Sequence, residues 1–122
     1  MVFLDTEFTD LLDPRLISIG LVAESGEELY IEVPFSIKHC SDFVREAVLP
    51  QLGKSPKAFC PLPLLRDRII TYLARVRDGE GDIIIAYDYS TDWWLLHDAR
   101  ANRYAYRPKP PGVPTDDERQ DL

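Results

Sequence analysis

The chain has 122 residues, of which 45% are hydrophobic and 29% are charged. This composition excludes a disordered or fibrous chain, and the length fits a single domain. Lys and Arg total 14 against 21 Asp and Glu, which gives a net charge of −7. That charge excludes binding to nucleic acid through basic side chains alone, so any nucleic-acid function would need metal ions between carboxylates and phosphates.

The sequence predicts neither a membrane-spanning helix nor a secretory signal. No apolar run approaches the roughly 20 residues that a membrane-spanning helix needs. The segment Met1–Asp5 also lacks the basic region of a secretory signal, so we expect a cytoplasmic protein without a membrane partner. Cys40 and Cys60 are too few and too isolated for a disulfide framework or a zinc site, and both are expected to be free thiols.

Three strands are predicted in the first third of the chain. A short apolar run over Val2–Leu4 ends at Asp5, and Arg15–Ala23 forms a longer, mostly apolar strand. Glu24–Glu27 has the composition of a hairpin turn, and Glu28–Val33 then alternates between apolar and polar residues. Strands with such short connections form an antiparallel meander.

Helical patterns and one more strand follow the meander. In chain order they are a helix from Asp42 to Leu49 capped by Ser41 and Asp42, a helix over Leu64–Val76, a strand over Asp82–Tyr87, and a helix from Thr91 to Tyr106 capped by Thr91 or Asp92. The continuous β-branched run in residues 82–87 is typical of a central strand covered on both faces. We predict an α/β fold whose mixed sheet has three antiparallel strands, a central parallel strand and flanking helices. Residues 1–107 form one predicted domain, and residues 108–122 form a proline-rich, acidic tail.

Two groups of carboxylates follow predicted strands. Asp5 and Glu7 are two residues apart, which places both on one face of a strand, and such a pair favours a hard divalent cation. A pair of this kind taken alone most often only flanks a turn. Asp88, Asp92 and Asp98 follow the last predicted strand, at the end where α/β sheets place their sites. If the first and last strands are neighbours, the two groups converge and could hold two metal ions for phosphodiester hydrolysis.

Four segments carry a resemblance to a known family. They are FLDTEFTD (Phe3–Asp10), SDFVREAVLPQL (Ser41–Leu52), AYDYSTDWWLL (Ala86–Leu96) and HDARANRYAYRP (His97–Pro108). They resemble, in chain order, the first motif, the helix after the third strand, the second motif and the last motif of the DEDD 3′–5′ exonucleases, which include ribonuclease T, oligoribonuclease and small bacterial exoribonucleases.

The resemblance implies an RNase H-like fold and a site with two Mg²⁺ or Mn²⁺ ions. The implied metal ligands and catalytic residues are Asp5, Glu7, Asp92 and Asp98. Thr9 would contact the terminal nucleotide. Phe8 would stack a base or pack in the core, and core packing is the favoured role.

The sequence departs from this family at two places. Asp92 and Asp98 are six residues apart on one predicted helix, or about 240° around its axis, where the family has several dozen residues and a further strand. The family's general base is also missing, because its His or Tyr position is Trp93 or Trp94 here. His97 is the nearby imidazole, and a packing or surface role is favoured for it. The chain therefore looks shortened between the second and last motifs, by nature or by engineering.

Aromatic and basic residues follow the second motif. Trp93 and Trp94 could stack bases, although filling the gap left by the missing segment is the favoured role for one of them. Arg100, Arg103 and Arg107 form a basic stripe that would face phosphates or, more commonly, solvent.

Two functions follow from these observations. The resemblance implies a metal-dependent 3′–5′ exonuclease that acts on the 3′ ends of single-stranded RNA or oligonucleotides and releases nucleoside monophosphates. The alternative is a catalytically impaired RNase H-like module that keeps the fold for binding or interaction, which the missing base and the net charge favour. A shortened sheet would also expose an edge to a second copy, so a homo-oligomer could restore a missing ligand.

Overall fold

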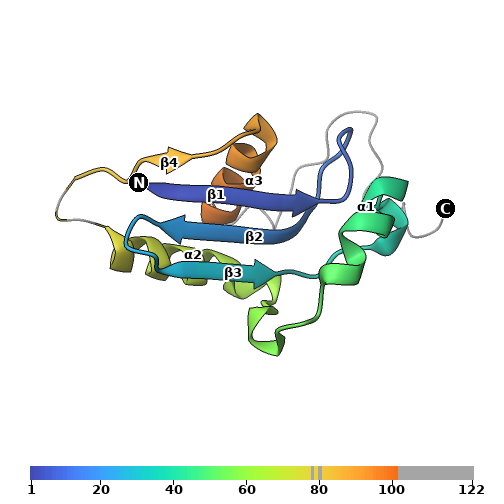
Figure 1. Ribbon diagram of the computed structural model, residues 1–122, viewed down its shortest axis with the longest axis horizontal. Coiled ribbons are helices and arrows are strands. Elements are labelled where there is room, and N and C mark those ends of the chain that lie inside the picture. The colour runs from blue at the N-terminus through green and yellow to red at the C-terminus, as the bar shows by residue number, and fades with distance from the viewer. Residues whose placement is uncertain (78, 80, 102–122) are drawn as a thin grey trace.

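The computed structural model describes residues 1–77, 79 and 81–101. These residues form a mixed four-stranded sheet with two helices packed on one of its faces (Figure 1). The α/β class predicted from the sequence is confirmed. The predicted tail over residues 108–122 and the last residues of the predicted domain lie outside the described residues.

The sheet contains the predicted meander. Its strands are β1 (Val2–Phe8), β2 (Leu16–Ala23), β3 (Glu28–Glu32) and β4 (Ile85–Ala86), in the spatial order β3-β2-β1-β4. β1 pairs with β2 and β2 with β3 in antiparallel fashion, whereas β1 and β4 are parallel. The hairpin turn between β2 and β3 contains Gly26, whose φ of 90° suits glycine. The three antiparallel strands, the parallel strand and its helical crossover are therefore confirmed.

The last strand differs from the prediction in length and position. β4 has two residues where six were predicted, and it pairs only with the start of β1. It forms the edge of the described sheet rather than its centre, and Ile84 beside it is 62% exposed. The run of three isoleucines indicated a strand covered on both faces, but the described residues supply no strand beyond β4.

Three α-helices and three short 3₁₀ segments complete the described fold. The α-helices are α1 (Asp42–Ala47), α2 (Leu62–Val76) and α3 (Ser90–Arg100), and the 3₁₀ segments are η1 (Ile37–His39), η2 (Leu49–Gln51) and η3 (Pro56–Ala58). The predicted cap of α1 is confirmed, because the Ser41 hydroxyl oxygen accepts a hydrogen bond from the Val44 N–H at 3.2 Å. None of the described helices combines the length and apolar character needed to cross a membrane.

The ends of two helices differ from the predictions. α1 ends two residues early, where the chain tightens into η2 around Pro50. The predicted cap of α3 is wrong, since its N-cap is Tyr89 and the helix already includes Thr91 and Asp92. Asp92 therefore does not cap its own helix, and its side chain points toward Thr6 in the sheet.

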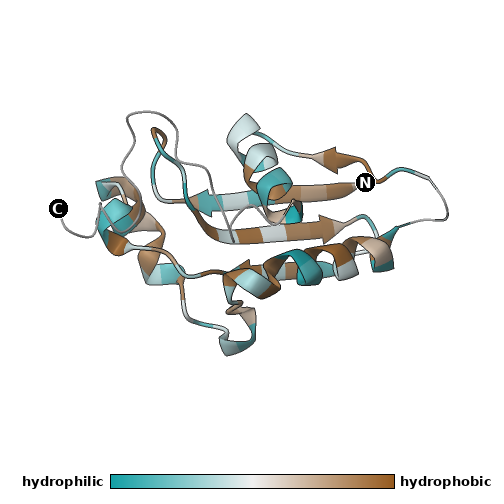
Figure 2. Cartoon of the chain, turned by 180° about the vertical axis from the view of Figure 1, so that it is seen from behind, coloured by the Kyte–Doolittle hydropathy of each residue, from teal (hydrophilic) through white to brown (hydrophobic). Residues whose placement is uncertain are grey.

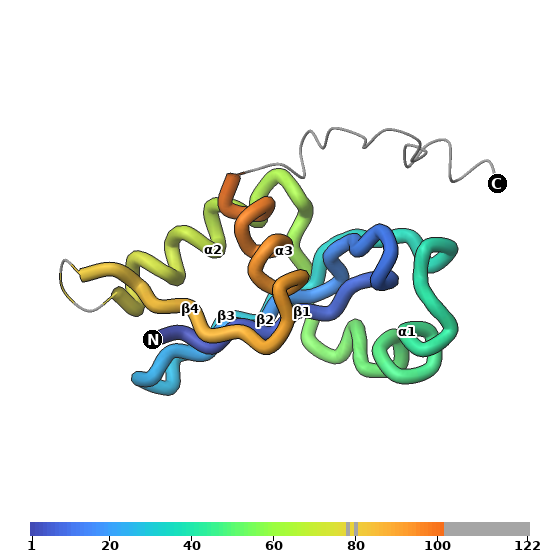
Figure 3. Tube along the Cα trace, turned by 90° about the horizontal axis from the view of Figure 1, so that it is seen from above, coloured from blue at the N-terminus to red at the C-terminus, as the bar shows by residue number. Residues whose placement is uncertain are grey.

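The core lies between one face of the sheet and the pair α2 and α3. α2 buries Leu65, Ile69 and Tyr72 there, and α3 buries Leu95 and Leu96. Seen from above, both helices lie on the same side of the strands (Figure 3). The strands are largely apolar, whereas the helices mix polar and apolar residues (Figure 2). In the described residues, no helix covers the other face of β1 in the same way.

Candidate functional site

The first carboxylate pair lies on the face of β1 that points away from the core. Along β1, Leu4 and Thr6 are buried while Asp5 is exposed and Glu7 half-buried, as a period of two requires. The shared face of Asp5 and Glu7 is thus confirmed. Their position is corrected, because β1 continues to Phe8 and both residues lie inside the strand rather than after it.

The second motif brings one more carboxylate to this strand. β4 runs beside β1, as convergence of the two groups required, and the first turn of α3 then lies against Thr6. The Thr6 hydroxyl donates a hydrogen bond to the Asp92 carboxylate at 2.5 Å, and the Asp92 side chain is only 2% exposed. This hydrogen bond fixes a buried carboxyl group next to Asp5 and Glu7.

The three carboxylates repel one another. The pKa of Asp5 is raised by partial desolvation and then by the nearby charges of Asp92 and Asp88, although a backbone hydrogen bond at Thr6 opposes the shift. The pKa of Glu7 is raised by desolvation and then by the charges of Asp5 and Asp92. Within the described residues neither Asp5 nor Glu7 forms an ion pair with a basic side chain. A bound cation would relieve this repulsion.

The donor set fits one divalent cation better than two. Carboxylate oxygens are the ligands that Mg²⁺ and Mn²⁺ prefer, and Mg²⁺ commonly uses one or two carboxylates and keeps several waters. Asp5 and Glu7 match that requirement. Among the described residues, however, no group of three or more Asp, Glu, His or Cys side chains is close enough to surround one ion. The arrangement of four carboxylates around two ions is therefore not formed by the described part of the chain.

Asp98 lies apart from the other three carboxylates. α3 is one continuous helix, so the six residues between Asp92 and Asp98 turn their side chains about 240° apart, as the sequence predicted. The Asp98 carboxylate instead lies 3.9 Å from Nδ1 of His97. It is also absent from the charges that raise the pKa of Asp5 or Glu7. The structure brings Asp5, Glu7 and Asp92 together and leaves Asp98 elsewhere.

The two residues expected to contact substrate, Thr9 and Phe8, make contacts within the fold. Thr9 is fully buried, and its hydroxyl oxygen accepts a hydrogen bond from the Arg15 N–H at 3.1 Å. Its carbonyl oxygen accepts another from the Ser41 N–H, which ties the end of β1 to the start of α1. Phe8 is half-buried and packs against the core, which was the favoured role for it. The Thr9 hydroxyl oxygen thus helps to stabilise the fold.

A pocket of about 220 Å³ opens beside Asp5 and Glu7. Its wall consists of Asp5, Thr6, Glu7, Ser18, Gly20, Tyr30, Val48, Gln51 and Leu52, from the first three strands and the segment around η2. Asp5 is paired with Gly20, and Gly20 with Tyr30, so a residue without a side chain lies between the carboxylate and the phenol. The Tyr30 hydroxyl donates to the Glu32 carboxylate at 2.8 Å.

Sequence reasoning missed the residues opposite the carboxylates in this pocket. The available signal was Gly20, a glycine inside a strand, which often marks a place where a ligand or another chain segment comes close. Counting back from the hairpin turn at Gly26 pairs Gly20 with Tyr30. Gln51 had no comparable signal, because it reaches the pocket through the packing of η2 over the sheet.

No protein-family model matches this chain, and no curated protein matches it in sequence. The described residues offer two carboxylates for a cation, a third carboxylate buried beside them, and an adjoining pocket lined by hydroxyl and amide groups.

Proposed function

We propose that the chain is a metal-dependent 3′–5′ exonuclease with an RNase H-like fold, which hydrolyses phosphodiester bonds of RNA or short oligonucleotides and releases nucleoside monophosphates. One observation carries the proposal: α3 brings Asp92 from a distant part of the sequence to β1, next to the Asp5 and Glu7 pair, which lines a pocket. The mixed sheet with a parallel β1–β4 pair and a helical crossover is compatible with that fold.

Asp5 and Glu7 would hold Mg²⁺ or Mn²⁺. When bound, the ion supplies positive charge that polarises the phosphoryl group and neutralises the developing negative charge. Asp92, held by Thr6, adds fixed negative charge behind the pair and strengthens the preference for a cation. Tyr30 and Gln51 line the pocket with exposed side chains and would orient the terminal nucleotide.

The site provides no imidazole near the carboxylates. The His97 ring is tilted relative to the Trp93 ring and edge to face with the Trp94 ring, on the part of α3 that carries Asp98. General acid–base catalysis typically contributes about 10²–10⁴ in rate, so we expect the enzyme to be slow by roughly that factor.

The alternative function is an RNase H-like module that binds nucleic acid or another partner without cleaving it. The separation of Asp98 from Asp5, Glu7 and Asp92 specifically favours this alternative, because a second ion would lack a ligand in the described residues. A second copy of the chain could supply that ligand, and in that case activity would depend on protein concentration.

The test is degradation of single-stranded RNA labelled at its 5′ end, with Mg²⁺ or Mn²⁺ and with EDTA. We expect a ladder that shortens from the 3′ end, needs the metal and disappears in Asp5→Asn. The matched control is Asp67→Asn, which removes the same charge from an exposed position on α2 and leaves cleavage unchanged. If the folded wild-type protein gives no metal-dependent ladder, the exonuclease proposal fails. RNA binding without cleavage would then favour the alternative.

A further inference from the structure

β3 forms one edge of the sheet, and part of that edge is unpaired. In the described residues no strand lies beside Glu28–Tyr30 on the side opposite β2. The end of the same edge already accepts an extended segment of the chain. Phe59 bridges Glu32 in parallel fashion, and the Cys60 N–H donates to the Glu32 carbonyl oxygen at 2.8 Å. The edge is therefore suited to strand pairing, and its first half is open.

The backbone groups of Glu28 and Tyr30 face the open side of this edge. The Glu27 carbonyl oxygen accepts a hydrogen bond from β2, and the Val33 N–H donates one to β2, so the odd-numbered residues between them face β2. Hydrogen-bonded and non-hydrogen-bonded residues alternate along an antiparallel pair. The N–H and C=O groups of Glu28 and Tyr30 thus point outward and offer two donors and two acceptors to a further strand.

A pocket of about 360 Å³ lies between this edge and α2. Its wall consists of Leu29 from β3 and of Asp67, Arg68, Thr71, Tyr72 and Arg75 from α2. Seen from behind, α2 lies in front of β3 (Figure 2). Leu29 packs toward the core, and paired residues of neighbouring strands point to the same face of a sheet. In a strand added to β3, the residue opposite Leu29 would therefore point its side chain into this pocket.

One positive charge in this pocket is not balanced. The Arg75 guanidinium contacts the Glu27 carboxylate. The Asp67 carboxylate lies 4.0 Å from the Arg66 guanidinium. Arg68 is half-buried, and no acidic side chain of the described residues forms an ion pair with it. The pocket thus carries a local excess of positive charge in a chain whose net charge is −7.

We propose that the groove between β3 and α2 binds an extended peptide segment of a partner protein, which adds to the sheet as a strand and places an acidic side chain beside Arg68. In this mode the backbone of Glu28 and Tyr30 supplies affinity and the pocket supplies specificity. Thr71 lies one turn beyond Arg68, and its hydroxyl can donate to the same carboxylate. The acidic side chain gives Arg68 the charged partner that the chain itself does not supply.

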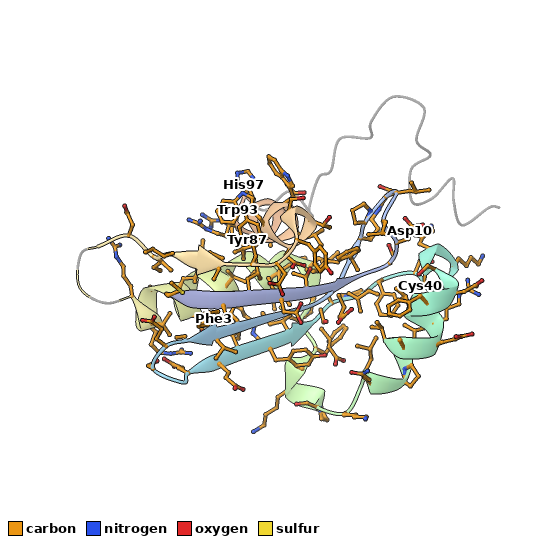
Figure 4. All side chains as sticks on the ribbon, turned by 45° about the horizontal axis from the view of Figure 1, so that its top comes forward. Phe3, Asp10, Cys40, Tyr87, Trp93 and His97 are labelled. Atoms are coloured by element: carbon orange, nitrogen blue, oxygen red, sulfur yellow. The ribbon has the colours of Figure 1, made fainter. Side chains whose placement is uncertain are left out.

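The groove is separate from the candidate site. None of the residues that line its pocket also lines the pocket beside Asp5 and Glu7. The groove lies at the β3 edge of the sheet, whereas Trp93 and His97 lie on the side of β4, the opposite edge (Figure 4). The proposal therefore does not depend on the exonuclease, and it can be tested in the presence of EDTA.

The probe is the fluorescently labelled peptide STVEVTS with blocked ends, and its binding is followed by anisotropy in EDTA. We expect it to bind more tightly than STVQVTS, although the net charge of the chain by itself favours the uncharged peptide. Arg68→Gln should remove this preference by weakening binding of STVEVTS about two- to fivefold, as for one partly exposed ion pair. The matched control is Arg45→Gln, which removes the same charge from an exposed position on α1 and keeps the preference.

A third peptide tests the addition of a strand. STVEVTS that is N-methylated at its three central residues keeps the side chains but lacks their N–H donors, and we expect it to bind about tenfold more weakly. Equal affinity of the wild-type protein for the Glu and Gln peptides would overturn the proposal, and so would equal affinity for the methylated and unmethylated peptides. Loss of the preference in Arg45→Gln would trace it to the overall charge and overturn the role of Arg68. Failure of the folded wild-type protein to bind STVEVTS would also overturn the proposal.

Discussion

At the scale of single residues, the contact between Thr6 and Asp92 joins two buried polar side chains. Both side chains are buried, and the Thr6 hydroxyl is the donor that satisfies the Asp92 carboxylate. A buried carboxylate that loses its donor keeps the full cost of its desolvation. We therefore expect Thr6→Val, which keeps the shape, to lower the free energy of unfolding by about 1–3 kcal/mol in urea denaturation. Thr6→Ser retains the hydroxyl and should lose less, and equal losses in the two variants would contradict this account.

The ionisation of Tyr30 makes the stability of the protein depend on pH in the alkaline range. Burial and the hydrogen bond to Glu32 raise its pKa from 10.0 to about 12. Between these values the unfolded chain has lost the phenolic proton and the folded chain has kept it, so stability falls as pH rises through this interval. Below it, Tyr30 contributes no pH dependence. Thermal unfolding across this range should show a shallower decline for Tyr30→Phe, and parallel curves would disprove it. Tyr72, whose pKa is also raised, keeps part of the decline in both proteins.

Residue patterns predicted part of the site. The two-residue spacing predicted that Asp5 and Glu7 share one face of the strand. The expectation that the first and last strands are neighbours predicted that Asp92 lies close to them. The partner of Asp92 could not be predicted, because the hydrogen bond joins residues 86 positions apart and depends on the exact docking of α3. The structural role of Thr9 was missed for the same reason, since its partners lie on other segments.

At the scale of elements, α2 holds the sheet and the crossover together. Neighbouring leucines on this helix have opposite environments, with Leu65 1% exposed and Leu64 53% exposed. Leu65→Ala should lower the free energy of unfolding by about 2–5 kcal/mol, because it removes core contacts and leaves a cavity. Leu64→Ala is the same change on the solvent side and should stay within about 0.5 kcal/mol of wild type. Similar losses in urea denaturation would mean that α2 is rotated relative to this structure.

Elements with a clear period were predicted well. The alternation in β3 and the helical spacing of α2 both report a single buried face, and their predicted ranges differ from the structure by only one or two residues. β4 was predicted too long, since a run of apolar residues shows burial preference but not which neighbours exist to bury it. The start of α3 was misplaced because Asp is a residue type that often caps helices, whereas here the Asp92 side chain forms a hydrogen bond with Thr6.

At the scale of the whole molecule, the net charge of −7 affects every experiment with cations. Any salt reduces the general repulsion in an acidic chain, so stabilisation by Mg²⁺ alone does not identify a site. A site-specific effect is saturable and depends on particular carboxylates. The local repulsion at Asp5 and Glu7 offers a way to separate the two contributions.

We expect Mg²⁺ to raise the thermal midpoint of the wild-type protein along a saturating curve, in excess of NaCl at equal ionic strength, because a cation bound only by the folded state stabilises it. Asp5→Asn should raise the midpoint without metal, since it removes a repelling charge, and should abolish the saturable response. Asp67→Asn changes the net charge equally from an exposed position, so it should retain that response. If the two variants respond alike to Mg²⁺ in differential scanning fluorimetry, the cation acts on the overall charge, and Asp5 and Glu7 do not form a metal site.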